Sequence, residues 1–443
     1  MSRARVVIAG AGLAGLTAAH YLERVGAEVT VVEARDRVGG RVHTLRGFEG
    51  GQYAEAGADL IESEQSHLLG LADEFGLKTT RILRKGWGFY GSSKGGRKTI
   101  RSAPDTFERA AQRLGPEIAA FKAAGRRWDS GIGQLLARQS VAGWLKAARA
   151  DGDLSAGVRG LRGFFLADPE RLSLLQLVDQ FASDDIPGEG RMYRLIDGND
   201  ALPAAMAAGL RGRILLDQVV KRVARRGAAL RVAVDDGRLQ QLPADYVVMA
   251  LPASTMKKVA FVPSLHDDQW RAITTLGYGP ATRVLLQFDR RFWRRPGRPT
   301  AYGTDQPTGA VWDGNEQQPG QPGILSLLAG GDAAGDVRDL IRRHGWPGLV
   351  RQLSWLGRPS RLLHATTVAW DRDPWALGGY AVFDPRFDPL LRPWLSRPAG
   401  RIVFAGEHTS DRWQGYMNGA IESGKRAALE VAMQAGLNYA GIV

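Results

Sequence analysis

Glycine residues at a fixed spacing follow the first apolar run of the chain. The run Arg5–Ala9 has the composition of a β-strand, and Gly10, Gly12 and Gly15 come directly after it. The first glycine permits a tight turn, the second lets backbone approach a pyrophosphate, and the third lets a helix pack closely on the strand. The free N–H groups at the start of a helix over about 13–25 would then face the phosphates. Spacing and context together predict a dinucleotide site.

An acidic residue completes this unit. Glu33 ends the next apolar run, 29–33, which we expect to be the second strand. Its carboxylate can accept hydrogen bonds from ribose hydroxyls and disfavours a 2′-phosphate. The residues after it lead to a glycine pair, Gly39-Gly40, and then Arg41. The arginine would add a charge-assisted contact to the pyrophosphate, and the glycines would let the backbone lie against the cofactor.

The run 33–41 resembles the extension found in the FAD-binding amine oxidase superfamily, which includes monoamine oxidases, polyamine oxidases and L-amino acid oxidases. Four further stretches and a short helix start are similar to that family, at 50–58, 198–203, 370–380, 404–410 and 413–420. The resemblance implies FAD as the cofactor. The expected cofactor-binding residues are Gly10, Gly12, Leu13, Ala14, Gly15, Glu33, Ala34, Arg35, Gly40, Arg41, Gly57, Ala58, Asp59, Val220, Trp370, Gly406, Glu407, Gly415, Tyr416 and Met417.

The resemblance also implies how the flavin is attached and what lies in front of it. In monoamine oxidases a cysteine just before the tyrosine of this segment carries the flavin covalently, whereas Gly379 occupies that place here and the chain has no cysteine. We therefore expect non-covalent FAD. By the same match, Tyr380 and Tyr416 resemble the two catalytic rings that guide an amine nitrogen to the flavin. A cation over such a ring gains about 0.5–2 kcal/mol; the alternative is that both tyrosines pack in a core with satisfied hydroxyls.

Two positions depart from the family pattern. Most of these oxidases have a lysine that holds a water near the flavin, and Arg283 stands in its place as the third expected catalytic residue. A guanidinium stays charged where a buried lysine can be neutralised, so Arg283 either holds the water, binds a substrate carboxylate, or is only a strand residue in a shifted register. L-Amino acid oxidases also carry an arginine in a stretch that here reads 58–62 without one. This favours an amine lacking an α-carboxylate, and disfavours a polyamine unless Glu62 lines an acidic funnel.

Periodicity predicts the elements that position these residues. We expect mostly helix over about 66–185, then mixed structure over 192–245 with a helix at 202–210 and strands near 214–220 and 230–234. Further expectations are strands at 246–251, Ala281–Phe288 and 401–405, a loop at 312–323 and a helix at about 416–434. The predicted fold class is α/β, a two-layer Rossmann-type FAD-binding domain (1–75, 190–270 and 396–443) with a mixed α+β substrate-binding domain inserted in two segments (76–189 and 271–395). The active site would lie where the domains meet.

Bulk composition narrows the remaining classes. The 443 residues are enough for two or three cores. The net charge of +13 is dispersed, and no nucleic-acid-binding signature accompanies it. The seven histidines have no metal-ligand spacing, so no metal is expected, and His408 is interpreted as structural or cofactor-contacting. Without a membrane-length apolar run or an apparent signal peptide, a cytoplasmic enzyme is predicted.

The predicted activity is removal of hydride from the carbon next to an amine nitrogen, which gives an imine and passes electrons through FAD to O2. The alternatives are an L-amino acid oxidase that uses Arg283 for the carboxylate, an FAD dehydrogenase or desaturase acting on a C–C bond, and a basic flavin-binding protein with a nucleic-acid or scaffold role. The expected partners are a small amine and O2, with a homodimer left open and neither nucleic acid nor membrane.

Overall fold

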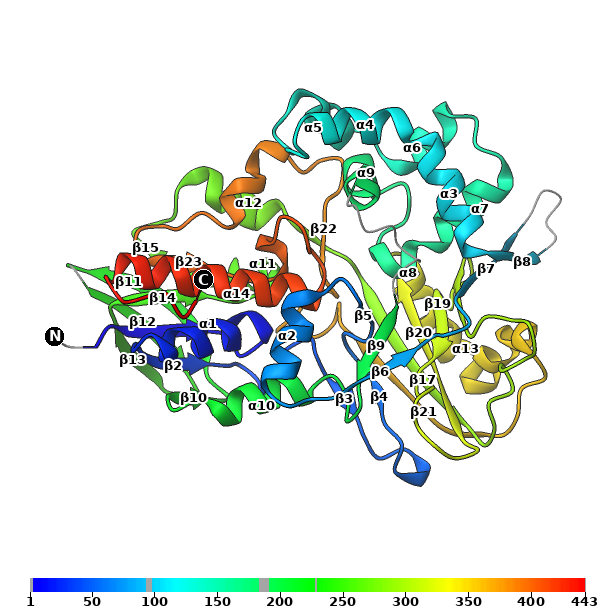
Figure 1. The fold of residues 1–443 in the computed structure, drawn as a ribbon, viewed down its shortest axis with the longest axis horizontal. Coiled ribbons are helices and arrows are strands. Elements are labelled where there is room, and N and C mark those ends of the chain that lie inside the picture. Colours follow the sequence, from blue (N-terminus) through cyan, green and yellow to red (C-terminus); the bar gives the residue numbers. More distant parts are fainter. Residues whose placement is uncertain (1–2, 93–97, 183–190, 228, 443) are drawn as a thin grey trace.

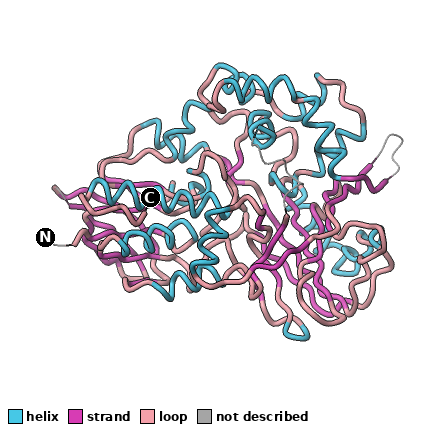
Figure 2. The backbone as a smooth tube through the Cα atoms, viewed as in Figure 1, coloured by secondary structure: helices cyan, strands magenta, loops and turns pink. Residues whose placement is uncertain are grey.

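The computed structural model describes residues 3–92, 98–182, 191–227 and 229–442 (Figure 1). Strands gather in two regions of the molecule, and the helices of the first half of the chain form a separate layer beside the second region (Figure 2). Both chain ends lie near the first region (Figure 1).

A five-stranded parallel sheet forms the centre of the first region, as the sequence predicts. Its order is β10 (Arg213–Leu215), β2 (Glu28–Val32), β1 (Arg5–Ala9), β14 (Tyr246–Met249) and β23 (Ile402–Phe404). The strands are short and apolar because helices or strands cover a parallel sheet on both faces. Successive side chains point to opposite faces, so Val6 and Ile8 pack toward the helices while Val7 and Ala9 pack the other way.

Helices cover one face of this sheet. They are α1 (Leu13–Arg24), α14 (Met417–Gln434), α2 (Ser66–Glu74) and α10 (Ala201–Gly209). The N-terminal α1 and the C-terminal α14 lie side by side (Figure 1). Gly424 permits their close contact, since a Cβ there would stand 2.3 Å from the carbonyl oxygen of Ala14. The N-terminal and C-terminal segments of the chain therefore build one helix layer.

A second sheet covers the other face, so the region has three layers where the sequence analysis expected two. Its order is β13 (Leu239–Ala244), β12 (Ala229–Asp235), β11 (Val219–Arg226) and β15 (Ala260–Val262). The prediction of a single strand at 214–220 is also wrong, because this stretch forms two strands that belong to different sheets. Asp217 adopts a positive φ of 55°, which ends β10 in the parallel sheet and lets β11 begin in the other sheet. Local periodicity cannot distinguish two such strands from one.

A seven-stranded sheet dominates the second region. Its order is β21 (Leu362–Ala369), β17 (Ala281–Phe288), β20 (Gly323–Gly330), β19 (Ala310–Asp313), β18 (Ala301–Thr304), β7 (Trp87–Ser92) and β8 (Lys98–Ser102). The prediction for Ala281–Phe288 is confirmed at both ends. Val284 and Leu286 pack against α13 (Ala333–Gln352) on one face. Alternation then turns Arg283 to the opposite face, toward the first region.

The stretch 66–185 is helical only in part. Within it β6 (Thr79–Ile82), β7 and β8 are strands, because β-branched and aromatic residues there complete sheets whose other strands come from outside this stretch. Residues 93–97 and 183–185 of this stretch lie outside the described residues. The predicted helices follow as α3 (Ala103–Arg113), α4 (Gly115–Ala123), α5 (Gly131–Ala137), α6 (Val141–Ala147), α7 (Gly152–Gly160), α8 (Arg162–Phe165) and α9 (Leu174–Ala182).

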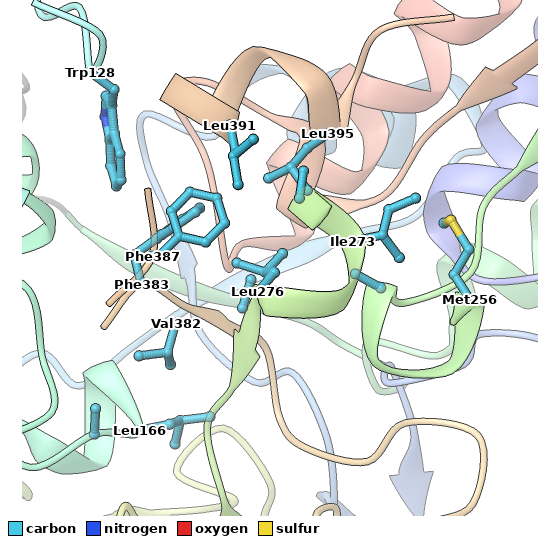
Figure 3. Packing of buried hydrophobic residues seen from close by; sticks show 14 of the residues in the cluster. Trp128, Leu166, Met256, Ile273, Leu276, Val382, Phe383, Phe387, Leu391 and Leu395 are labelled. Atoms are coloured by element: carbon cyan, nitrogen blue, oxygen red, sulfur yellow. The ribbon is translucent and has the colours of Figure 1, made fainter. Parts of the chain in front are cut away.

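Short elements connect these parts. They are β3 (Thr44–Leu45), η1 (Glu49–Gly51), β4 (Ala54–Glu55), β5 (Ile61–Glu62), β9 (Met192–Leu195), α11 (Ala253–Met256), α12 (Asp267–Thr275), β16 (Gly277–Tyr278), η2 (Ser354–Leu356), β22 (Ala381–Val382), η3 (Pro389–Leu395) and η4 (Glu407–Thr409). An apolar cluster fixes the segment after Tyr380 (Figure 3). In it Phe383 makes edge contacts with Trp128 of the helical layer, at 4.6 Å between ring centroids, and with Phe387, at 4.8 Å.

Candidate active site

A cavity of about 640 Å³ lies between the two regions. Every cofactor-binding residue that the sequence predicts lines it, with the exception of Gly15, and so do Tyr380, Tyr416 and Arg283. These residues come from positions as far apart as 10 and 417. The cavity runs from the carboxyl ends of β1 and β2 to the inner face of the seven-stranded sheet, the usual location for a nucleotide on an open parallel sheet.

Gly15 lies beneath the cavity wall, at the point where α1 packs against the turn after β1. A Cβ at Gly15 would stand 1.9 Å from the carbonyl oxygen of Gly10, so only glycine lets α1 approach the turn after β1. Gly12 differs, because a Cβ there would meet no described protein atom within 4 Å. Its open side faces the cavity. The turn therefore has room for a ligand at Gly12 and none for a side chain at Gly15.

Glu33 is buried at the end of β2 and already holds the loop on either side of it. Its carboxylate accepts hydrogen bonds from the backbone N–H of Ala11, at 2.8 Å, and of Arg35, at 3.0 Å. Burial raises the pKa of Glu33, although these two donors oppose the shift. The residue lines the cavity, so a carboxylate with free lone pairs stands where a ribose would be recognised.

Two arginines of the loop after Glu33 contact the segment that carries Tyr380. Arg35 makes a two-point ion pair with Asp373, at 2.8 and 2.9 Å. Arg41 donates to the carbonyl oxygen of Gly379 at 2.8 Å and to Glu407 at 2.9 Å. Residues 35–41 and 373–379 thus meet at two points with the same spacing. The sequence predicts Arg35 and Arg41 as cofactor contacts, but it does not reveal these protein partners.

Glu407 organises the C-terminal side of the cavity. Besides Arg41, its carboxylate accepts the backbone N–H of Gly415 at 3.0 Å and of Ala381 at 3.3 Å. His408, next to it, is buried, and burial lowers its pKa to about 4, so its ring is neutral at physiological pH. A neutral buried ring fits the structural interpretation of His408 better than a role as a general base.

Tyr380 and Tyr416, the two tyrosines expected to form an aromatic cage around the amine, are half-buried on the cavity wall. The hydroxyl of Tyr380 donates to the carbonyl oxygen of Phe164 in the helical layer, which fixes the ring. Gly415 packs against that ring, since a Cβ at Gly415 would lie 3.3 Å from it. Tyr416 is fixed by an edge contact with Trp413, at 5.5 Å. Burial raises the pKa of both hydroxyls, so both rings are neutral.

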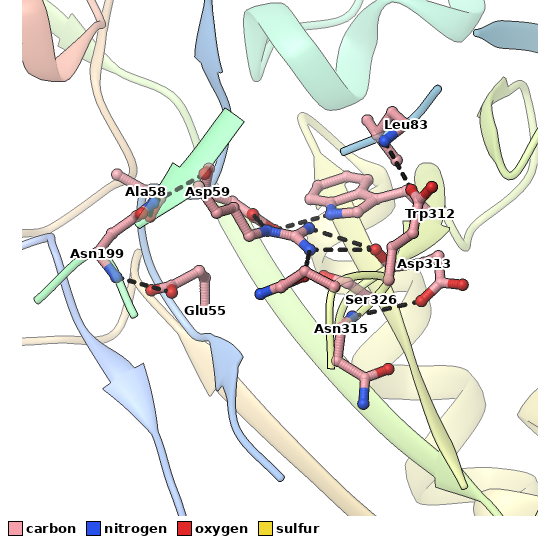
Figure 4. Close-up of polar contacts among 12 residues, drawn as sticks. Glu55, Ala58, Asp59, Leu83, Asn199, Trp312, Asp313, Asn315 and Ser326 are labelled. Carbon is pink, nitrogen blue, oxygen red and sulfur yellow. Dashed lines mark hydrogen bonds and ion pairs between the residues drawn. The ribbon is translucent and has the colours of Figure 1, made fainter. Parts of the chain in front are cut away.

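Arg283 belongs to a buried polar cluster with Asp59, Trp312 and Ser326, three residues that Figure 4 labels. Its guanidinium donates to the Ser326 hydroxyl at 3.0 Å and to the carbonyl oxygen of Gly57 at 2.7 Å, and it lies over the ring of Trp312 at 4.6 Å. Asp59 is 3.9 Å away. The Nε of Arg283 has no hydrogen-bond partner among the described residues. Burial lowers the pKa of Arg283, with Asp59 opposing, and a guanidinium remains charged nonetheless.

Other cavity residues belong to no motif and could not be predicted from the sequence. The wall around Tyr380 is largely aromatic, with Trp87 in edge contact with Phe164 at 5.0 Å and near Trp312 at 6.2 Å. These residues come from β7, α8 and β19, and only their pairing in space makes a chamber. Glu62 also lines the cavity, beside Gln176 and Gln180.

The described residues contain no group of three or more histidine, cysteine, aspartate or glutamate side chains that could hold a metal ion. Among the described helices, none is long and apolar enough to cross a membrane. The cavity itself fits a flavin dinucleotide: a glycine turn open at Gly12, a buried acid at Glu33, and a long apolar extension toward Tyr380. These features have the chemistry that phosphates, a ribose and an aromatic ring system, respectively, would require.

Comparison with known proteins agrees with this arrangement. Residues 13–432 match the family described as flavin containing amine oxidoreductase. The chain belongs to this family. It is therefore a flavin-dependent oxidoreductase of an FAD-dependent family, as the sequence resemblance implied.

Individual relatives differ in what they act on. The chain is 31% identical to a putative flavin-containing monoamine oxidase, AofH, of Mycobacterium tuberculosis, over 96% of each chain. It is 28% identical to an L-amino-acid oxidase of Siganus canaliculatus, over 98% of this chain and 86% of the relative. Among solved structures, cyclohexylamine oxidase from Brevibacterium oxydans matches with a TM-score of 0.87 at 22% identity, covering 98% of this chain and all of the other. Putrescine oxidase bound to putrescine matches at 0.84 and 23%, over 98% and 99%. These two likenesses show the fold over the full length.

Proposed function

We propose that the protein oxidises the C–N bond of a small apolar amine to an imine, with non-covalently bound FAD as the hydride acceptor and O2 as the final oxidant. The observation that carries this proposal is the aromatic chamber at the inner end of the cavity, with Tyr380 and Tyr416 on its wall. An apolar chamber suits an amine with an aromatic or alkyl group. FAD supplies the redox chemistry, and the protein supplies position and electrostatics.

The proposed FAD site uses the cavity residues already described. Gly12 and the start of α1 would hold the pyrophosphate with Arg41, and Glu33 would hold the adenosine ribose. Gly379 and the absence of cysteine support non-covalent attachment. In this proposal the FAD-binding domain comprises 1–75, 190–270 and 396–443, and 76–189 with 271–395 form the substrate-binding domain.

The chamber would favour the neutral form of the amine. A low-dielectric site disfavours an ammonium ion, and a nearby positive charge disfavours it further. Arg283 supplies that fixed charge on the chamber wall. A neutral nitrogen has the lone pair that assists loss of hydride from the adjacent carbon, so no strong general base is required. The rings of Tyr380 and Tyr416 would orient the nitrogen and exclude water from it.

A second candidate is oxidation of an L-amino acid. The observation in its favour is the Nε of Arg283, which is buried at the cavity and has no partner among the described residues. Arg283 could therefore donate a hydrogen bond to a carboxylate next to the reacting carbon. Hydrogen bonds to charged groups are worth about 1.5–3 kcal/mol, so loss of such a contact would reduce kcat/KM by roughly 10- to 150-fold.

Anaerobic mixing of the yellow protein with matched pairs of compounds tests both candidates. Phenylethylamine and L-phenylalanine share one skeleton and differ in the carboxylate. Bleaching of the flavin by the amine alone supports the amine oxidase, and bleaching by the amino acid that Arg283→Met abolishes supports the second candidate. If neither these compounds nor a wider panel of amines and amino acids bleaches a flavin that is fully bound, both oxidase assignments are wrong.

A further inference from the structure

Two buried guanidinium groups share one buried carboxylate next to the flavin cavity. Asp59 pairs with Arg194, and its other oxygen accepts the indole N–H of Trp312 at 2.7 Å. Arg283 lies 3.9 Å from the same carboxylate. The side chains of Asp59, Arg194 and Arg283 are between 1% and 4% exposed. An uncompensated charge that is buried this deeply is strongly destabilising. The charge state of any further acid near these three residues therefore affects the group.

Glu55 is that further acid. It ends β4 and is 1% exposed. One carboxyl oxygen accepts the Thr44 hydroxyl at 2.8 Å, and the other accepts the backbone N–H of Asn199 at 2.9 Å. The Asn199 amide in turn donates to the carbonyl oxygen of Asp59 at 2.8 Å (Figure 4). Glu55 is thus buried on the side of Asp59 that faces away from the cavity, and hydrogen bonds through Asn199 connect the two residues.

We propose that Glu55 is a positioning residue that holds a proton behind Asp59 and so leaves Arg283 as an uncompensated positive charge on the cavity wall. With Glu55 neutral, two guanidinium cations face one carboxylate. With Glu55 ionised, the cluster has no net charge. The state of Glu55 therefore decides how strongly this wall attracts an anion.

Burial and neighbouring charges place the ionisation of Glu55 in an experimentally accessible pH range. Burial, and next the charge of Asp59, raise the pKa of Glu55 to about 8, against the two hydrogen-bond donors. Glu55 is thus protonated at neutral pH and ionises as the pH rises through about 8. The positive charge on the cavity wall is present below this pH and is cancelled above it.

The charged and titratable groups around Glu55 come from each packed element. Asp59, Arg194 and Arg283 act on it from the cavity side, and Arg46 and Tyr53 act from the outer side, where Asp200 contacts Thr44. Arginines keep their charge throughout this range. Asp200 is held as an anion by Arg46, which lowers its pKa against the effect of burial. Burial raises the pKa of Tyr53. Glu55 is therefore the group of this set that changes charge near pH 8.

Benzoate and benzamide are the probes that test this inference. They have the same size, one is an anion and the other neutral, and neither titrates near pH 8. We measure their dissociation constants with the FAD-loaded protein by calorimetry from about pH 7 to about pH 9.5. The expected result is that benzoate binding weakens about tenfold, equivalent to about 1.4 kcal/mol, while benzamide binding stays constant. This inference rests on the proposed FAD cavity, but the measurement needs no amine turnover, so its failure is distinct from that of the proposed activity.

Three variants sharpen the test. Glu55→Gln should bind benzoate at pH 9.5 as tightly as the wild type does at about pH 7, and Glu55→Asp, which keeps an ionisable group, should restore pH dependence. Glu23→Gln is the matched control, because Glu23 is also buried and accepts two backbone N–H groups, but these belong to Arg211 and Gly212 and not to the cluster around Asp59. A constant benzoate affinity in the wild type, or the same pH dependence in Glu55→Gln, overturns the inference. The wild-type series stands alone if the Gln variant fails to fold.

Discussion

Separation of Arg35 from Asp373 should release FAD without unfolding the protein. The pair joins the loop 35–41, which lines the cavity, to the segment 373–379, which leads into Tyr380. Arg35 and Asp373 are 10% and 21% exposed, so solvent screens this pair less than a surface ion pair. We therefore expect Arg35→Gln and Asp373→Asn each to weaken FAD binding.

The magnitude follows from the geometry. A surface ion pair contributes about 0–1 kcal/mol, whereas hydrogen bonds to charged groups contribute about 1.5–3 kcal/mol. Two short bonds in a mostly buried site fall between these limits, and we expect a coupling energy of about 1–2 kcal/mol. That corresponds to an FAD dissociation constant raised about 5- to 30-fold. Burial opposes ionisation of Asp373, but the hydrogen bonds and charge of Arg35 outweigh it and lower the pKa. The contribution is thus present at neutral pH and is lost only as the pH falls through that lowered pKa.

The assay is titration of the apoprotein with FAD by flavin fluorescence, for the wild type, both single variants and the double variant. Arg46→Gln is the control, because Arg46 makes a similar two-point pair with Asp200, at 2.8 and 2.9 Å, but neither residue lines the cavity. A coupling energy below about 0.3 kcal/mol, or FAD affinities no different from that of the control, would refute the view that these segments close on the cofactor.

Three further predictions concern the glycine turn, the buried histidine and the cage. Gly12→Ala should fold with an unchanged melting temperature but bind FAD weakly, whereas Gly15→Ala should fail to fold stably, since its Cβ would lie 1.9 Å from the Gly10 oxygen; equal melting temperatures would contradict this. Because the pKa of His408 is lowered to about 4, the unfolded chain binds a proton below about pH 6.5 that the folded chain does not, so unfolding free energy should fall by roughly 3 kcal/mol between these values, and His408→Gln should remove most of that loss in denaturant titrations. Tyr380→Leu should lower kcat/KM for an aromatic amine by about 2- to 12-fold, as expected for loss of an aromatic contact of about 0.5–1.5 kcal/mol, and Tyr380→Phe by less; an equal loss would show that the hydroxyl, not the ring, matters.

The elements that carry the cofactor motifs could be predicted because their signals are local. The glycine turn follows β1 directly, and β17 has the predicted bounds Ala281–Phe288, since continuous apolar runs and turn residues lie within a few positions of each other. Recognition of the family from short motifs is confirmed over residues 13–432. All the cofactor contacts predicted from these motifs except Gly15 line the cavity, but other lining residues, such as Gln218, Ala250 and Thr255, were not predicted.

The remaining features depended on contacts between distant residues. The second sheet behind β1 was missed because a strand buried by another sheet has the same pattern as one buried by helices. The sequence identified Arg283 as a residue that could bind an anion or hold a water. The charge balance around it, however, depends on Asp59, Arg194 and Glu55, which are between 89 and 228 positions away in the sequence. The sequence identifies which side chains can carry a charge. The field that acts on it is a sum over neighbours brought together by folding, and only the tertiary structure decides which neighbours those are.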